Sequence, residues 1–134
     1  MARVLKPPTE LALADGDRSV FLASSIAMGR AEPWQAAIEQ ALRDLPITIL
    51  NPHRDSWDAS WEQSIDHAEF RGQVEWELQA QERASMIAMY FAPTEPSPIT
   101  LLELGLFARS GKLVVCCPTG FWRRLFPLRH SNGC

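Results

Sequence analysis

Short apolar runs alternate along the chain with segments of helical periodicity. Each run spans four to six residues and is bounded by turn residues, which is typical of a buried strand. Between the runs, apolar residues recur at three- and four-residue spacing, which predicts amphipathic helices. The expected strands are 19–23, 47–50, 86–91 and 112–117, and the expected helices are 34–45, 61–83 (with a break at Gly72 left open) and 98–109.

This alternation predicts an α/β fold with a doubly wound parallel sheet and right-handed helical crossovers. We expect a flavodoxin-like strand order of 2-1-3-4, with the ligand at the switch point between the first and third strands. Residues 18–124 form the expected single domain. Residues 1–17, with Pro7-Pro8 and Gly16, read as a loose tail, and residues 125–134 as an irregular tail without a regular fifth strand, which would leave the fourth strand's edge exposed.

Composition narrows the class of partner. The 134 residues suffice for one core, and a net charge of −3 gives no electrostatic footprint for nucleic acid. No apolar run approaches ~18 residues and the start lacks a secretory signal, so we expect no membrane contact. Three cysteines, two of them adjacent, fit neither a disulfide framework nor a metal site, which favours a cytoplasmic protein with reduced thiols. Without a metal cluster or dinucleotide fingerprint, we expect no cofactor.

One carboxylate, Glu103, stands near the start of the third helix within an almost wholly apolar run. One interpretation is structural: Thr100 and Glu103 have the spacing of a capping box, and Ser97-Pro98 offers a competing helix start. The other is chemical, because a helix N-terminus at the carboxyl end of a parallel strand favours an anion and is where open sheets bind ligands. The local sequence leaves both open.

Two other segments follow strands at the same expected edge. Ser24-Ser25-Ile26 is a loop of small residues that a ligand could approach closely, although an ordinary βα turn has the same pattern. Residues 51–58 hold two acids, an Arg, a His and a Trp, which is dense for a connector. Both loops would border one cleft with the 93–103 segment.

Together, four stretches resemble the nucleoside 2-deoxyribosyltransferase-like family from Val20 to Arg123. They are Val20–Ile26 with Trp34-Gln35, Asn51–Asp58, Phe70–Gln73 with Val74–Leu78, and Pro98–Ala108 with Ser110–Lys112. The last, with Thr-Leu-Leu-Glu-Leu-Gly, is the most specific.

The resemblance implies a glutamate nucleophile at Glu103, which would form a glycosyl ester with a 2′-deoxynucleoside and release the sugar to an acceptor base or to water. A covalent intermediate of this kind splits one difficult substitution into two easier ones. The leaving base needs a proton or hydrogen bond, so a second acid should lie nearby. The implied partners are a small-molecule 2′-deoxynucleoside and a nucleobase, with a homo-oligomeric assembly. The candidate substrate-binding residues are Ser24, Ser25, Ile26, Asn51, Arg54, Asp55, Asp58, Ser85, Ser97 and Thr100.

Ser85 and the irregular C-terminal end at residues 125–134 favour an alternative, a non-catalytic nucleoside- or nucleotide-binding domain of the same fold. Ser85 stands where relatives commonly carry an Asp that contacts the base, and Ser97 stands where better-studied transferases have an Asp six residues before the nucleophile. Ser can hydrogen-bond a base but is a poor acid. The intact Thr100-Leu-Leu-Glu103 segment favours the enzyme.

Overall fold

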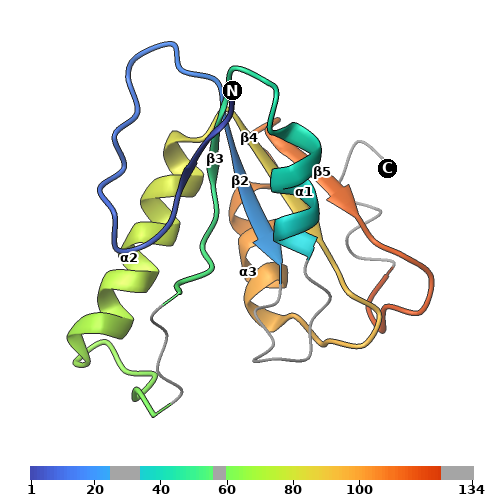
Figure 1. The fold of residues 1–134 in the computed structure, drawn as a ribbon. Helices are drawn as coiled ribbons and strands as arrows, with labels where there is room; N and C mark the ends of the chain where they lie inside the picture. The colour runs from blue at the N-terminus through green and yellow to red at the C-terminus, as the bar shows by residue number, and fades with distance from the viewer. Residues whose placement is uncertain (25–33, 56–59, 125–134) are drawn as a thin grey trace.

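The computed structural model describes residues 1–24, 34–55 and 60–124. Within these ranges the secondary structure alternates between strands and helices (Figure 1). The elements in chain order are β1 (Arg3–Leu5), β2 (Ser19–Ser24), α1 (Trp34–Leu42), β3 (Thr48–Leu50), α2 (Ala68–Arg83), β4 (Met86–Tyr90), α3 (Pro98–Phe107) and β5 (Leu113–Cys116).

All five strands form one parallel sheet in the order β1-β3-β2-β4-β5. The four strands predicted from apolar runs are β2 to β5, and they lie in the predicted order. The α/β class and the flavodoxin-like sheet are therefore confirmed. The reversal of strand order falls between β2 and β4, where ligands bind in open sheets.

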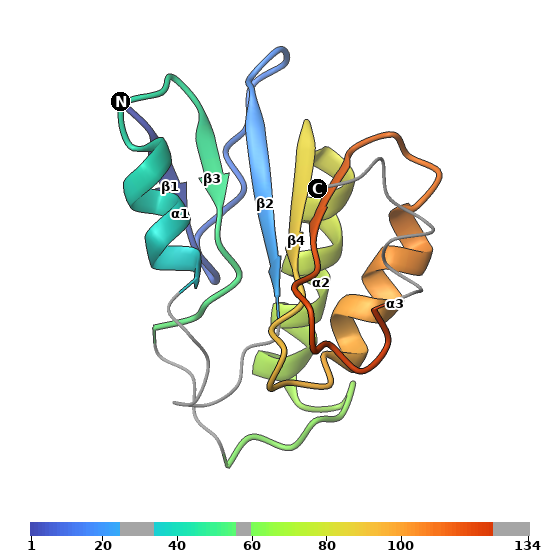
Figure 2. The same ribbon diagram turned by 90° about the vertical axis from the view of Figure 1, so that its right-hand side faces the viewer.

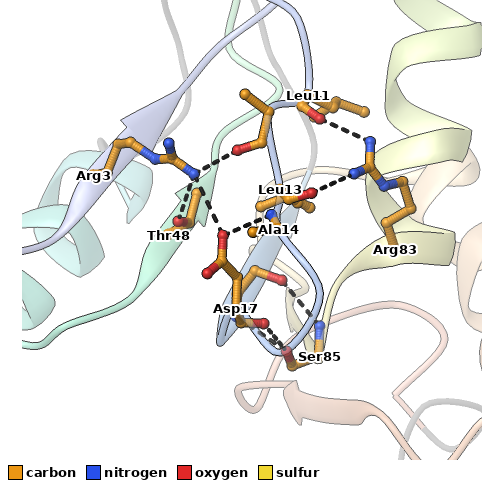
Figure 3. A network of polar contacts seen from close by, with 10 residues as sticks. Arg3, Leu11, Leu13, Ala14, Asp17, Thr48, Arg83 and Ser85 are labelled. Atoms are coloured by element: carbon orange, nitrogen blue, oxygen red, sulfur yellow. Dashed lines mark hydrogen bonds and ion pairs between the residues drawn. The ribbon is translucent and has the colours of Figure 1, made fainter.

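The prediction of a loose N-terminal tail is wrong for Arg3–Leu5, which adds an edge strand beside β3. A strand of three residues, with Arg3 and Val4 exposed, is too short to give a hydrophobic signal in the sequence. The segment after β1 runs along α2, where the Trp76 indole donates to the Thr9 carbonyl at 2.8 Å. Arg83 donates to the Leu11 carbonyl at 2.7 Å (Figure 3).

Helices cover both faces of the sheet, as a doubly wound fold requires. Figure 2 shows α1 on one side and α2 and α3 on the other. The larger core lies beneath α2 and α3 and includes Trp76, Leu104 and Met89. The smaller core lies beneath α1 over β2 and β3. Val114 on β5 is 48% exposed, and the expected irregular tail at 125–134 lies outside the described residues.

The helix boundaries differ from the periodicity in two places. α1 ends at Leu42 rather than Leu45, and α2 begins at Ala68 rather than Trp61. The His67 side chain caps α2 by accepting from the Phe70 amide at 3.4 Å, and Gly72 does not interrupt the helix. In the described ranges, no helix combines the length and hydropathy that crossing a membrane requires.

Candidate functional site

The residue at which α3 begins distinguishes the two interpretations of Glu103, a helix cap and a chemical group. Ser97 is the N-cap and Pro98 the first helical residue, as the competing start predicts. Ser97 has φ 47° and ψ 52° and makes no side-chain capping bond. Thr100 is thus the third residue of the helix and Glu103 the sixth. The capping-box interpretation, which needs Thr100 as N-cap and Glu103 in the first turn, is wrong.

Glu103 instead points at the neighbouring helix. Its carboxylate Oε2 accepts a hydrogen bond from Nε2 of Gln81 on α2, and its exposed fraction is 9%. Burial, and next the negative charge of Glu77, raise the pKa of Glu103 from an ordinary 4.5 to about 8, although the Gln81 bond opposes the shift. Glu103 therefore changes between its neutral and its charged form near pH 8, far above the pH at which an exposed carboxyl group does so.

A second acid, Glu77, belongs to the same arrangement. Burial raises its pKa from 4.5 to about 7, opposed by a hydrogen bond from Gln73 Nε2 at 3.4 Å. Gln73, Glu77 and Gln81 follow one another at four-residue spacing, so they form one stripe along α2. We call Glu103 and this stripe the acid array.

The acid array was not identified from the sequence, because Glu77 is one of several acids along α2. Gln73 and Gln81 are 5% and 1% exposed, so the stripe is buried despite its polarity. The signal that could have found it is the four-residue spacing of polar residues beside Trp76 and Ala80, which are themselves buried.

The loop after β3 connects to the acid array. Gln73 Nε2 also donates to the Pro52 carbonyl, at 2.9 Å. Asn51, next to Pro52 at the carboxyl end of β3, is 3% exposed; its Nδ2 donates to Glu39 Oε1 on α1 at 2.6 Å. Its Oδ1 accepts from the His53 amide at 2.9 Å. Asn51 therefore fixes this loop between helices on opposite faces of the sheet.

Three further predicted residues lie at or just beyond the same edge. Ser24 ends β2, and its hydroxyl accepts from Gln35 Nε2 at 2.6 Å. The Arg54 guanidinium lies 4.9 Å from the centre of the Trp61 ring. The exposed Asp55 carboxylate pairs with Lys6, which follows β1, at 3.3 Å.

Ser97 and Thr100 lie on the same helix as Glu103, and both are 1% exposed. The Ser97 hydroxyl has no hydrogen-bond partner among the described residues. A buried hydroxyl without a partner is uncommon and calls for an explanation, such as a ligand that supplies one.

Ser85 is not brought to this edge. It precedes β4 and lies at the amino ends of the strands, where its hydroxyl accepts from the Ser19 amide at 3.1 Å (Figure 3). The Ser19 hydroxyl accepts from the Ser85 amide at the same distance, and the Ser85 hydroxyl donates to the Asp17 carbonyl at 3.2 Å. Ser85 thus joins segments of the fold on the side away from the start of α3.

The remaining predicted residues, Ser25, Ile26 and Asp58, lie outside the described residues. Within residues 1–24, 34–55 and 60–124, no group of three or more His, Cys, Asp or Glu side chains could hold a metal ion. The described site holds two carboxyl groups in different environments, the buried Glu103 and the half-buried Glu77, each beside an amide donor. Such a pair can provide a nucleophile and an acid.

Comparison with known proteins identifies the family of the chain. No curated protein matches the chain. The family model described as nucleoside 2-deoxyribosyltransferase like matches residues 17–121, which include every described strand except β1 and all three helices. The chain belongs to the nucleoside 2-deoxyribosyltransferase-like family.

Proposed function

We propose that the protein transfers the deoxyribosyl group of 2′-deoxynucleosides to an acceptor base, or to water, through a covalent ester on Glu103. The observation that carries the proposal is the placement of Glu103: it is buried, it does not cap its own helix, and it is held by a side chain from another helix. Family membership supports the same class of substrate.

In the first step, the ionised Glu103 carboxylate attacks the anomeric carbon of the sugar. The carbon–nitrogen bond to the base breaks, and the base leaves with the bonding electron pair. Glu77, as a neutral carboxylic acid, gives the base a proton directly or through one water. In the second step, the Glu77 carboxylate takes a proton from the acceptor base or water as it attacks the same carbon, the ester bond breaks, and Glu103 regains its charge.

The raised pKa of Glu77, about 7, suits the role of acid. A carboxyl group with an ordinary pKa would already be ionised near neutral pH and could not serve as the acid. Two interacting carboxyl groups close together resist ionising at the same time, so one proton is shared between them. The reactive form is the one in which Glu103 is charged and Glu77 is neutral. Because the pKa of Glu103 is raised further than that of Glu77, the proton lies mainly on Glu103 in the free protein and moves to Glu77 before the attack.

The sugar and base would lie between α3 and the carboxyl ends of the strands. We assign their polar contacts to Ser24, Asn51, Arg54 and Asp55, together with Ser97 and Thr100 on α3. Ser25, Ile26 and Asp58 are assigned to the same set by the resemblance. The unpartnered Ser97 hydroxyl supports this placement most directly.

We further propose that the cytoplasmic protein acts as a homo-oligomer through an apolar stripe on the outer face of α3. Ile99, Leu102 and Leu106 recur at helical spacing and are each more than 60% exposed. Side chains of this size rarely form an exposed stripe without a partner. Introducing a charge with Leu102→Glu should lower the mass measured by sedimentation if a second copy covers them.

The alternative is a domain that binds nucleosides without reacting with them. The observation that favours it is Ser97, which replaces an acid with a neutral hydroxyl. Against this alternative, Glu77 on α2 has a raised pKa and is the acid that we propose in place of the one absent at Ser97.

The first experiment is mass spectrometry of the intact protein after brief incubation with a 2′-fluoro-2′-deoxynucleoside, whose glycosyl ester should react onward slowly. We expect a sugar-sized adduct on Glu103, and none in Glu103→Ala. Base exchange should fall by on the order of a thousandfold or more in that variant. Binding without an adduct in the wild-type chain would support the non-catalytic domain.

A further inference from the structure

The Gln81 side chain is poorly explained as a structural element. It is 1% exposed and its Nε2 donates both to Glu103 Oε2 and to the Glu77 carbonyl, the latter at 3.3 Å. Its own Oε1 has no partner among the described residues. A buried amide with one unsatisfied acceptor costs free energy, and an apolar side chain of similar shape would fill the same volume without that cost.

The backbone that carries Gln81 is held in place from outside the helix. The Lys112 ammonium donates to the Gln81 carbonyl at 2.7 Å and to the Glu82 carbonyl at 3.0 Å. These bonds satisfy carbonyls of the last turn of α2 and tie that turn to the start of β5. The amide that meets Glu103 is thus presented by a fixed platform.

The contact distinguishes the two oxygens of the carboxylate. Oε2 of Glu103 is occupied by the Gln81 amide, whereas no described residue donates to Oε1. A hydrogen-bonded oxygen is the weaker nucleophile of the two, because its lone pair is already engaged.

We propose that Gln81 is a positioning residue, which anchors Oε2 of Glu103 and so leaves Oε1 as the atom that attacks the sugar. This inference rests on the proposed function. Oε1 bonds to the anomeric carbon in the first step, and Oε2 becomes the carbonyl oxygen of the ester. When the carbon–Oε1 bond breaks in the second step, the electron pair returns to the carboxylate and Gln81 again donates to its charged form.

The same bond acts in both half-reactions. Losing it lets the carboxylate rotate before attack and removes a donor from the carboxylate as it leaves. We therefore expect slower formation and slower breakdown of the ester. A purely structural Gln81 would change neither rate beyond its effect on folding.

The test replaces Gln81 with Met, which has similar length and no donor. Gln79→Met is the matched control, since Gln79 is the same residue type on the same helix but is exposed. With a 2′-fluoro-2′-deoxynucleoside, intact-mass time courses should show adduct formation at least tenfold slower in Gln81→Met, and slower loss of the adduct when an acceptor base is added. Gln79→Met should match the wild-type chain in both.

A second readout needs no turnover. Carbon-13 NMR of glutamate-labelled protein follows the ionisation of Glu103 directly, with Glu103→Gln used to assign its signal. Gln81→Met should raise the Glu103 pKa further, and Gln79→Met should leave it unchanged. Thermal unfolding below pH 5, where Glu103 is neutral, should show Gln81→Met at least as stable as wild type.

The outcomes separate this inference from the proposed function. Wild-type adduct rates together with an unchanged Glu103 titration in Gln81→Met overturn the positioning role. A wild-type chain that forms no adduct overturns the proposed function, and the titration still decides independently whether Gln81 anchors the carboxylate.

Discussion

Two groups of polar residues that contact α2 differ in their burial and in their partners. At the amino ends of the strands, most of the groups are exposed and each has a partner: Arg3 lies 3.8 Å from Asp17, and the exposed Ser85 and the buried Ser19 bond each other reciprocally. We call these residues, with Arg83, the amino-edge network (Figure 3). In the acid array, two carboxyl groups of like charge are buried together, and the donors they meet among the described residues are amides rather than cations.

This difference indicates that the amino-edge network serves stability, whereas the acid array serves function. The amino-edge network holds the N-terminal segment against α2 and β4 at modest gain, because exposed ion pairs contribute little. The acid array costs stability, because burial disfavours the charged carboxyl groups. A costly arrangement of titratable groups with shifted pKa values is typical of an active site.

We expect the largest effect on activity from Glu77→Gln, which tests whether the acid array is catalytic. If Glu77 protonates the leaving base, kcat should fall by on the order of a hundredfold or more with ordinary 2′-deoxynucleosides. A substrate that carries 7-methylguanine should be largely spared, because that base already bears a positive charge and leaves without needing a proton. Steady-state rates with both substrates check this, and an equal loss with both would remove Glu77 as the acid.

The same pair predicts how stability changes with pH. The pKa of Glu103 rises from 4.5 in the unfolded chain to about 8 in the folded protein, so its contribution to stability is complete below pH 4.5. As pH rises to about 8, the unfolded chain gains stability by ionising first, and the folded protein loses relative stability. Glu103→Gln cannot ionise, so it should be more stable than wild type above pH 8, on the order of 2–4 kcal/mol.

Chemical denaturation at pH 5 and pH 8.5 measures this difference. The gain of Glu103→Gln over wild type should be small at pH 5 and large at pH 8.5. A gain that does not depend on pH would mean that packing, and not ionisation, sets the cost of the acid array.

Much of the fold was predictable because its signals are local. Apolar runs located β2 to β5, and Ser97-Pro98, one of the two helix starts that the sequence offered, is where α3 begins. β1 was not predictable, because its three residues are stabilised by pairing with β3, which lies more than 40 residues away in the sequence. The start of α2 was misplaced because Trp61 and Ile65 continue the apolar spacing of a helix that forms only from Ala68.

The candidate site was predictable in part for the same reason. Glu103 stands out as the lone acid in an apolar helix. Glu77 and Gln81 do not, because α2 is rich in polar residues and the contacts that bury one stripe of them come from segments distant in the sequence, α3 and the loop after β3. Ser85 was placed in the site by resemblance to an acid in relatives, and the geometry puts it at the amino edge.

Ser97→Ala tests whether the hydroxyl at the start of α3 binds substrate. In the free protein the Ser97 hydroxyl is buried without a described partner, so its removal should leave the unfolding free energy unchanged or slightly raised. If the hydroxyl binds substrate, KM should rise by about five- to tenfold, equivalent to one hydrogen bond. Denaturation and steady-state kinetics on the same preparation measure both; lower stability with an unchanged KM would make Ser97 structural.

Ser85→Ala makes the opposite change at the amino edge. The variant loses an acceptor for the Ser19 amide and a donor to the Asp17 carbonyl, so stability should fall by about 1 kcal/mol. KM and kcat should stay within about twofold of wild type, because the contacts of Ser85 join strand starts and not the start of α3. A rise in KM without loss of stability would instead return Ser85 to the substrate site. The two variants thus compare a hydroxyl that already has partners with one that has none among the described residues. We expect the first, Ser85, to stabilise the fold and the second, Ser97, to bind a ligand.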